Sequence, residues 1–118
     1  MITKSELNEF NQAIFTGITV GIGSLVFLFS TGASILVQCS FQCGNTDEFL
    51  IGHGEDLMTS NLLFSFLNQC VKQVEVLEGD IFKLVFCNGN EIDIIPDANG
   101  FESYVVTTSQ GIYPVISY

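Results

Sequence analysis

Along most of this chain apolar side chains occupy every second position, and the same pattern occurs twice. Thr31-Gly32 and Asn88-Gly89 lie 57 residues apart, and superposing these two pairs aligns apolar positions on both sides of them. The aligned positions are Leu25 with Phe82, Phe27 with Leu84, Phe29 with Phe86, Ile35 with Ile92 and Val37 with Ile94. Alternation, a two-residue turn that ends in glycine and renewed alternation are typical of a β-hairpin. Each half of the chain therefore predicts one hairpin.

The repeat extends beyond these hairpins, because an alternating stretch precedes each of them and a short strand with acidic and aromatic residues follows. These flanking stretches are 14–22 and 71–77 before the hairpins, and 47–51 and 101–106 after them. We predict one domain, 1–118, with an internal repeat over 14–52 and 71–107, in which each half is a four-stranded antiparallel meander. The expected fold class is α+β, mainly β, with the two meanders forming one sheet or a barrel-like sandwich.

Two segments have helical rather than strand character. The large apolar residues of 56–70 follow helical spacing and predict one helix that connects the two halves. Residues 3–12 predict a short helix at the N-terminus. The candidate N-caps are Thr59 or Ser60 for the connecting helix and Thr3 or Ser5 for the N-terminal one. Pro96 is expected to end the second hairpin, and Pro114 indicates an irregular C-terminal tail.

The charge of the chain limits its partners. Thirteen acidic residues and only three lysines give a formal net charge of −10 on 118 residues. A field of that sign repels nucleic acid, phosphate-rich ligands and anionic membrane surfaces, and it attracts basic proteins. The chain is also 47% hydrophobic and contains eleven Phe, which excludes an acidic disordered tail. We therefore expect a folded domain with an acidic exterior, no nucleic-acid partner and no membrane partner.

The charge is distributed unevenly, and the uncharged part needs its own explanation. No charged residue occurs in 12–46, so hydropathy alone permits a membrane span at 17–37. The equivalent hairpin of the second half holds Lys83, Glu91 and Asp93, which a lipid-spanning helix would tolerate only at a large cost. The repeat therefore favours strands in both halves. The lack of charge then predicts that both faces of the first hairpin are covered.

The acidic residues form the candidate binding site. Eleven of the thirteen follow residue 46, and several of them share the face of the second hairpin that lies opposite its apolar positions. The candidate partner-binding residues are Glu75, Glu78, Asp80, Glu91, Asp93, Asp97, Glu102 and Tyr104. A row of carboxylates on a rigid sheet can pair with the lysines and arginines of a partner. The alternative is an ordinary solvated face that keeps the protein in solution.

No catalytic or metal-binding motif accompanies these acids. Cys39, Cys43, Cys70 and His53 lack the paired short spacing of a structural zinc site, and we interpret Cys39, Cys70 and Cys87 as small apolar residues of the core. His53 lies in a Gly-His-Gly loop without a nucleophile elbow, which favours an exposed loop residue. The glycines at 17, 21 and 23 lack the helix and the lysine of a phosphate-binding loop. We therefore predict a protein that is not an enzyme, with no cofactor and no metal.

The expected location follows from the N-terminal residues. The first ten residues are polar and carry no cationic segment followed by an apolar run, so no secretory signal is predicted. This favours the cytoplasm, where all four cysteines would be reduced. The oligomeric state is left open, although the surplus of apolar residues indicates that some surface is shared with another molecule.

The second repeat resembles a known family. The run Leu84 to Ile94, LVFCNGNEIDI, followed by Phe101-Glu102-Ser103-Tyr104, is similar to small two-repeat β-rich bacterial domains. Those domains read Leu-x-Phe-x-x-Gly-x-x-Leu-x-Ile and close with Tyr or Trp after Glu. They are immunity proteins encoded beside polymorphic toxins, including those of contact-dependent growth inhibition systems. The resemblance implies a stoichiometric inhibitor of a cognate toxin, for which a basic nuclease domain fits the charge, with Phe101, Tyr104 or Tyr113 as possible anchors.

A second function remains open beside this one. A β-meander domain of this size can close around a hydrophobic cavity, which the phenylalanines would line. The alternative prediction is therefore a small-molecule or peptide binding module.

Overall fold

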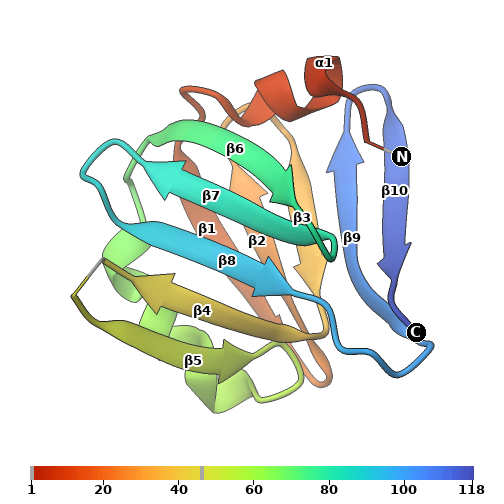
Figure 1. Ribbon diagram of the computed structural model, residues 1–118. Helices are drawn as coiled ribbons and strands as arrows, with labels where there is room; N and C mark the ends of the chain where they lie inside the picture. The colour runs from red at the N-terminus through yellow and green to blue at the C-terminus, as the bar shows by residue number, and fades with distance from the viewer. Residues whose placement is uncertain (1, 46) are drawn as a thin grey trace.

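The computed structural model of the protein describes residues 2–45 and 47–118, which form two five-stranded antiparallel sheets (Figure 1). The first sheet has the order β1-β2-β3-β9-β10, with β1 Phe15–Gly21, β2 Ser24–Phe29, β3 Ser34–Val37, β9 Glu102–Thr108 and β10 Gly111–Ile116. The second sheet has the order β5-β4-β8-β7-β6, with β4 Ser40–Gly44, β5 Phe49–His53, β6 Val71–Leu77, β7 Ile81–Phe86 and β8 Glu91–Ile95. The mainly β class is confirmed, and of the two predicted arrangements the chain adopts the sandwich.

The two halves of the chain exchange strands between the sheets. Each half places three consecutive strands in one sheet and then crosses to add a hairpin to the other. In the first hairpin Phe27 pairs with Ile35, and in the second Leu84 pairs with Ile92, as the sequence alignment had placed them. The exchange is closed by two antiparallel contacts, β3 with β9 and β8 with β4. Each sheet therefore depends on strands from both halves.

Each half contains five strands where we predicted four. The additional strands are β4 in the first half and β10 in the second. The crossing from β3 to β4 takes only Gln38 and Cys39, and the buried positions Val37, Cys39 and Phe41 alternate without a break through it. Because no glycine or proline interrupts this alternation, the sequence contains no turn signal at the crossing.

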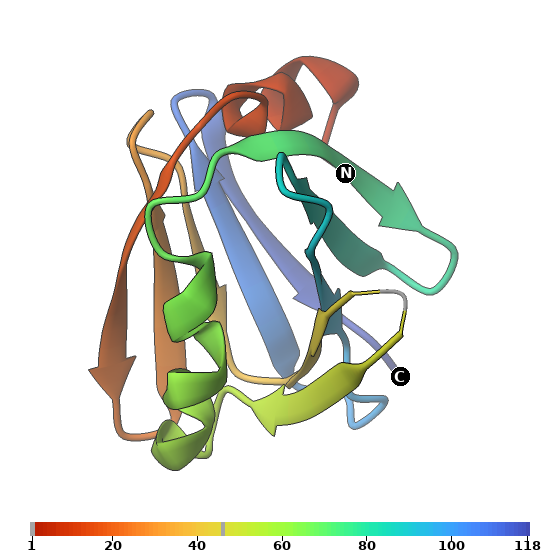
Figure 2. The ribbon, with the colours of Figure 1, turned by 90° about the vertical axis from the view of Figure 1, so that its left-hand side faces the viewer.

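Two helical segments close the ends of the sandwich. α1, Lys4–Leu7, continues into the 3₁₀-helix η1, Asn8–Phe10, and Thr3 caps α1 in a capping box with Glu6. The connecting helix is the 3₁₀-helix η2, Leu57–Phe66, and its N-cap is Asp56, whose side chain accepts from the Met58 N–H, rather than Thr59 or Ser60. Figure 2 shows η2 across the open side between β1 and β5. Both predicted helices are therefore present, but shorter and mainly 3₁₀ in form.

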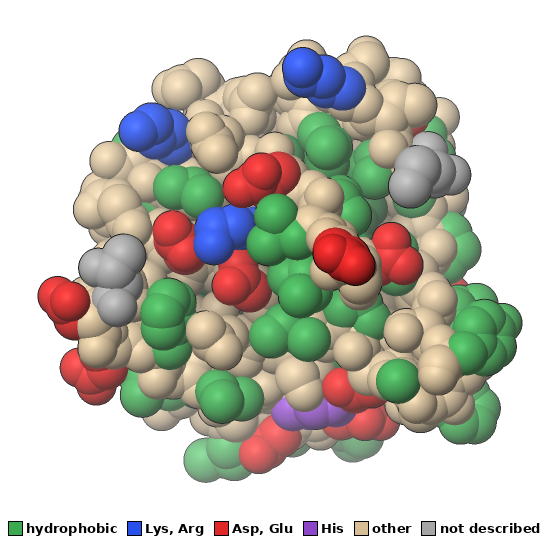
Figure 3. Space-filling view, viewed as in Figure 1, with side chains coloured by type: hydrophobic (Ala, Val, Ile, Leu, Met, Phe, Trp, Pro, Cys, Tyr) green, Lys and Arg blue, Asp and Glu red, His purple; other side chains and the backbone are tan. Residues whose placement is uncertain are grey.

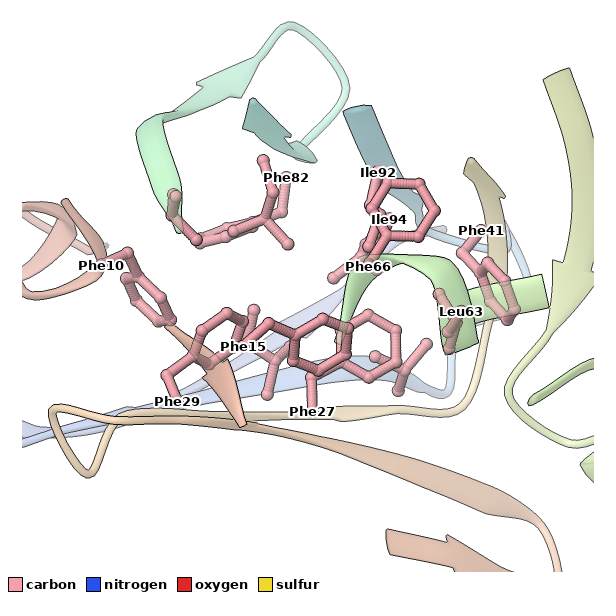
Figure 4. Packing of buried hydrophobic residues seen from close by; sticks show 14 of the residues in the cluster. Phe10, Phe15, Phe27, Phe29, Phe41, Leu63, Phe66, Phe82, Ile92 and Ile94 are labelled. Atoms are coloured by element: carbon pink, nitrogen blue, oxygen red, sulfur yellow. The ribbon is translucent and has the colours of Figure 1, made fainter. Parts of the chain in front are cut away.

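The space between the sheets is filled by phenylalanine side chains (Figure 4). The Phe10 ring lies edge-on to Phe29 and to Phe82, with centroids 5.2 and 5.5 Å apart. Phe15 stacks on Phe29 at 5.3 Å, and all of these side chains are at most 4% exposed. The rings pack against one another in the centre of the molecule, so the core is the place where residues from both sheets and from η1 meet.

Cys70 and Cys87 form a disulfide, so the expectation that all four cysteines are thiols is wrong for this pair. Cys70 directly precedes β6 and Cys87 directly follows β7. Because Val71 pairs with Phe86 in the hairpin, the two cysteines lie opposite each other, with Cα atoms 5.6 Å apart. The other two cysteines are free and buried. Burial raises the pKa of Cys39 to about 12 and that of Cys43 to about 11, so both are protonated near neutral pH.

The segment 17–37, which hydropathy alone allowed as a membrane span, is folded into β1, β2 and β3. In the ranges 2–45 and 47–118, no helix has the length and apolar character needed to cross a bilayer.

Glu6 is buried, with 3% of its surface exposed, and its carboxylate accepts from the Thr3 N–H at 3.1 Å and from the Thr3 hydroxyl at 2.6 Å. Burial acts to raise the pKa of Glu6, but the hydrogen bonds from Thr3 and the nearby phenol of Tyr113 outweigh it and hold the pKa below 4.5. A lowered folded-state pKa means that the ionised carboxylate stabilises the fold above the unfolded-state pKa. This stabilisation is lost as the pH falls through the folded-state pKa.

Replacing Glu6 should therefore flatten the acid limb of the stability curve. We expect the free energy of unfolding of the wild type to fall more steeply than that of Glu6→Gln from about pH 5 to about pH 3. Urea titrations followed by circular dichroism at several pH values measure this. Glu48→Gln, at an exposed position before β5, is the control and should keep the wild-type slope. Equal slopes for Glu6→Gln and the wild type would contradict a lowered pKa at Glu6.

Candidate functional site

An apolar groove of about 730 Å³ opens on the side of the sandwich where the edge strands β6 and β10 face each other. α1 lies at one end of this groove (Figure 1). The apolar lining comes from both sheets and from the N-terminal segment: Ile2, Leu7, Val74, Val76, Leu77, Phe82, Tyr104, Val106, Ile112, Tyr113, Pro114 and Val115. The groove exists because the strand exchange leaves β6 and β10 at the edges of different sheets, with no hydrogen bonds between them.

Three of the predicted carboxylates, Glu75, Glu78 and Asp80, line this groove. Glu75 projects from β6, and the other two lie in the turn between β6 and β7. Figure 3, which views this side of the molecule, shows acidic side chains beside hydrophobic ones. Lys4 is the one basic residue in the described lining. Carboxylates beside an apolar surface suit a partner group that combines a cation with an apolar stem, such as lysine or arginine.

Tyr104 supports the turn from below and does not reach solvent. It is 1% exposed, and its hydroxyl donates to the Asp80 carbonyl oxygen at 2.7 Å. Burial is the main cause that raises the pKa of Tyr104, so the phenol stays protonated as a donor. In this structure the ring of Tyr104 is therefore buried, and its hydroxyl contacts the chain's own turn. It forms part of the groove floor and holds the position of the acidic turn.

The acidic face of the second hairpin is partly neutralised by Lys83. The Lys83 Nζ lies 2.8 Å from the Glu91 carboxylate and 3.7 Å from that of Asp93, and Glu75 pairs with Lys83 across β6 and β7. The hydrogen bond from Lys83 to Glu91 raises the pKa of Lys83. Burial raises the pKa of Asp93, against the opposing effect of Lys83. Within residues 2–45 and 47–118, neither Glu75 nor the two turn carboxylates, Glu78 and Asp80, form an ion pair.

Asp97 and Glu102 lie away from the groove. The Asp97 carboxylate is 2.8 Å from His53 Nε2 and accepts from the Ser40 hydroxyl at 3.2 Å. Glu102 is exposed at the start of β9. The predicted residues thus divide into a groove group, Glu75, Glu78, Asp80 and Tyr104, a sheet-face pair, Glu91 and Asp93, and a separate pair, Asp97 and Glu102.

His53 is half-buried rather than an exposed loop residue. Its Nε2 faces Asp97, and its Nδ1 accepts from the Glu55 N–H at 3.1 Å. A general base needs a ring nitrogen that can reach the proton of a nucleophile. In this arrangement both ring nitrogens of His53 are engaged, and the side chain joins the end of β5 to the chain after β8.

The sequence did not predict β10, the strand that forms the second wall of the groove. Residues 111–116 form β10, where we predicted an irregular tail around Pro114. Proline lacks the N–H that a central strand needs, and it is tolerated here because β10 is an edge strand. The groove side of β10 carries Tyr113 and Val115. The two-residue spacing of these apolar side chains is the sequence pattern from which this strand could have been predicted.

No protein-family model, no curated protein and no solved structure matches this chain. The groove and its acidic rim are therefore the observations on which an assignment of function rests.

Proposed function

We propose that this protein is an immunity protein that binds and neutralises a cognate toxin domain. The toxin is a basic nuclease domain of the kind used in contact-dependent growth inhibition, and inhibition is stoichiometric, without chemistry by the inhibitor. The observation that carries the proposal is the apolar groove lined by Glu75, Glu78 and Asp80 in a chain with a net charge of −10.

Charge and shape have separate parts in this binding. The net charge attracts a basic domain over a distance of about one Debye length, ~10 Å at moderate salt, and raises the association rate. The groove then receives one or two long basic side chains of the toxin. Their stems contact Val74 and Val76, and their cationic ends reach the carboxylates of Glu78 and Asp80. Contacts of this kind slow dissociation, since most affinity resides in a few well-packed side chains.

The proposal assigns no catalytic residue, cofactor or metal to the chain. The two free thiols are protonated near neutral pH, and both nitrogens of His53 are engaged. The proposed place of action is the cytoplasm, where a nuclease would meet nucleic acid. Disulfides are unusual there, so the redox state of Cys70 and Cys87 in growing cells bears directly on this part of the proposal.

The test uses the toxin domain encoded by the neighbouring upstream gene. We expect Glu78→Gln/Asp80→Asn to weaken binding by roughly 30-fold, with the association rate of the wild type falling steeply as salt rises. The matched control is Asp47→Asn/Glu48→Gln, which changes the net charge equally at the loop between β4 and β5. Stopped-flow kinetics and calorimetry measure both variants.

Each outcome of this experiment decides something. A control that weakens binding as much as the groove variant would show that only bulk charge matters and would remove the groove from the proposal. If the toxin domain does not bind the wild type at low salt, the immunity function itself is excluded.

The volume of the groove favours one second candidate, a binding site for a small amphipathic cation or a short peptide. Small-molecule sites typically span about 300–1,000 Å³, and this groove, at about 730 Å³, falls in that range. Thermal-shift screening with amphipathic cations measures such binding. A compound that stabilises the wild type but not Val76→Trp, which fills the groove, would support this candidate.

A further inference from the structure

The outer face of the first sheet has no role in the proposed function. It carries fewer charged residues than the outer face of the second sheet. Val26, Leu36, Val105 and Pro114 lie side by side across β2, β3, β9 and β10, on the side opposite the core. Their neighbours in sequence, such as Phe27, are buried between the sheets. The row therefore forms the centre of a flat sheet face that points away from the rest of the chain.

This face is nearly free of charge. Glu102, at one end of β9, is the single charged residue on the five strands of the first sheet. The outer face of the second sheet, by contrast, holds Lys83, Glu91 and Asp93. Large apolar side chains are nevertheless exposed on this face, with Leu28 37% and Ile112 68% exposed. In a chain with a net charge of −10, the strands of this sheet thus carry a single carboxylate, at one end of β9.

The sequence predicted that both faces of the uncharged hairpin are covered, and the chain itself covers only one. η2 contacts β1, β2 and β5 at the open side of the sandwich, and η1 contacts β6. In Figure 2 no element of the described chain lies beyond the outer side of β1 and β2. A cover for the second face must therefore come from another molecule.

We propose that this face is a homodimer interface, on which a second copy of the chain packs the same face about a two-fold axis. A two-fold interface brings each surface against itself. On an acidic surface of this protein that would oppose many carboxylates, which is unfavourable, whereas the strands of this sheet carry only Glu102, at one end of β9. A basic partner, in turn, would gain little electrostatic attraction from a face with a single carboxylate. The charge pattern thus selects a second copy as the occupant.

The size of the face suits a dimer of moderate affinity. Five strands spaced by about 4.8 Å, each with about six residues on a rise of about 3.3 Å, give a face of roughly 24 by 20 Å. Two copies would bury on the order of 1,000 Å², which is at the lower limit of specific interfaces. We therefore expect a dissociation constant in the micromolar range, on the order of 10 µM.

The dimer leaves the β6 side of the groove accessible. On β10 the two surfaces meet: Ile112 and Pro114 alternate with Tyr113 and Val115 and lie on the outer face, at the rim of the groove. A dimer would thus present two grooves and bind two partners. The inference does not depend on the proposed function, because it concerns a different surface and a different occupant.

Sedimentation velocity over a concentration range of about 1–500 µM tests the proposal. We expect the wild type to dimerise and Leu28→Glu or Val26→Glu, both on β2 and outside the groove lining, to raise the dissociation constant at least tenfold. The control is Ile51→Glu, an isoleucine 72% exposed on the edge strand β5 of the other sheet, which should leave the dimer intact. Circular dichroism of each variant verifies that the fold is retained.

Salt dependence separates this inference from the proposed function. Two copies with like net charge repel each other, so added salt should strengthen the dimer, whereas it should weaken toxin binding. A wild type that stays monomeric over the whole range would overturn the inference. A dimer that Ile51→Glu disrupts and Leu28→Glu does not would overturn it as well, since it would assign the contact to the β5 edge.

Discussion

Reduction of the Cys70–Cys87 disulfide is expected to lower the free energy of unfolding by about 3 kcal/mol. The bond joins residues 17 apart in sequence and closes the open end of the β6–β7 hairpin. Without it, the unfolded chain gains the freedom of that loop, while the folded hairpin keeps its register through hydrogen bonds such as that from the Cys87 N–H to the Cys70 carbonyl. The effect is large because β6 is an edge strand with one neighbour, β7, and forms a wall of the groove.

Urea unfolding with and without a reducing agent measures this loss. The variant Cys70→Ala/Cys87→Ala should match the reduced wild type and show no response to reductant. Free thiols counted by alkylation and mass spectrometry before unfolding establish which form is present. The expectation fails if the oxidised wild type and the double variant unfold at the same urea concentration. Alkylation in growing cells, with the same readout, also tests the proposed cytoplasmic location.

The parts of the fold that depend on local sequence could be predicted. Both central hairpins follow from alternation around a turn that needs a positive φ, and Gly32 and Gly89 adopt φ of 92° and 91°. The Thr3 cap follows from side-chain chemistry in the same way. In each case the residues that decide the structure lie within a few positions of one another.

The parts that depend on the exchange between sheets could not be predicted. The groove combines the N-terminal segment, β6 and β10, which are distant in sequence and become neighbours only because the crossings leave β6 and β10 at sheet edges. The acidic residues were found from their alternation, but the pairing of Lys83 with Glu91 depends on the register of two strands. The burial of Tyr104 depends on the contact of β9 with the opposite half of the chain.

The sequence predicts an exposed His53 in the Gly-His-Gly loop, 52–54, whereas in the structure this loop has a packing role. The ring of Phe41 covers Gly52, and a Cβ at Gly54 would overlap the carbonyl oxygen of Val37. The Gly54 N–H donates to the Cys39 carbonyl at 2.8 Å. Gly52 therefore lies against β4, and Gly54 lies against the short crossing that carries the chain from the first sheet to the second.

Gly54→Ala is therefore expected to destabilise the fold by about 3 kcal/mol, since backbone atoms of the crossing, unlike a flexible side chain, have little room to yield. Gly17→Ala is the matched control, because its methyl group would meet only Leu28 Cδ1 at 3.6 Å, an ordinary contact. Thermal and urea unfolding measure both variants. Equal stability of the two would contradict a tight crossing. A loss of stability confined to Gly54→Ala would show that the exchange of strands between the sheets requires glycine at this position. No catalytic role of the neighbouring His53 is then needed to explain that glycine.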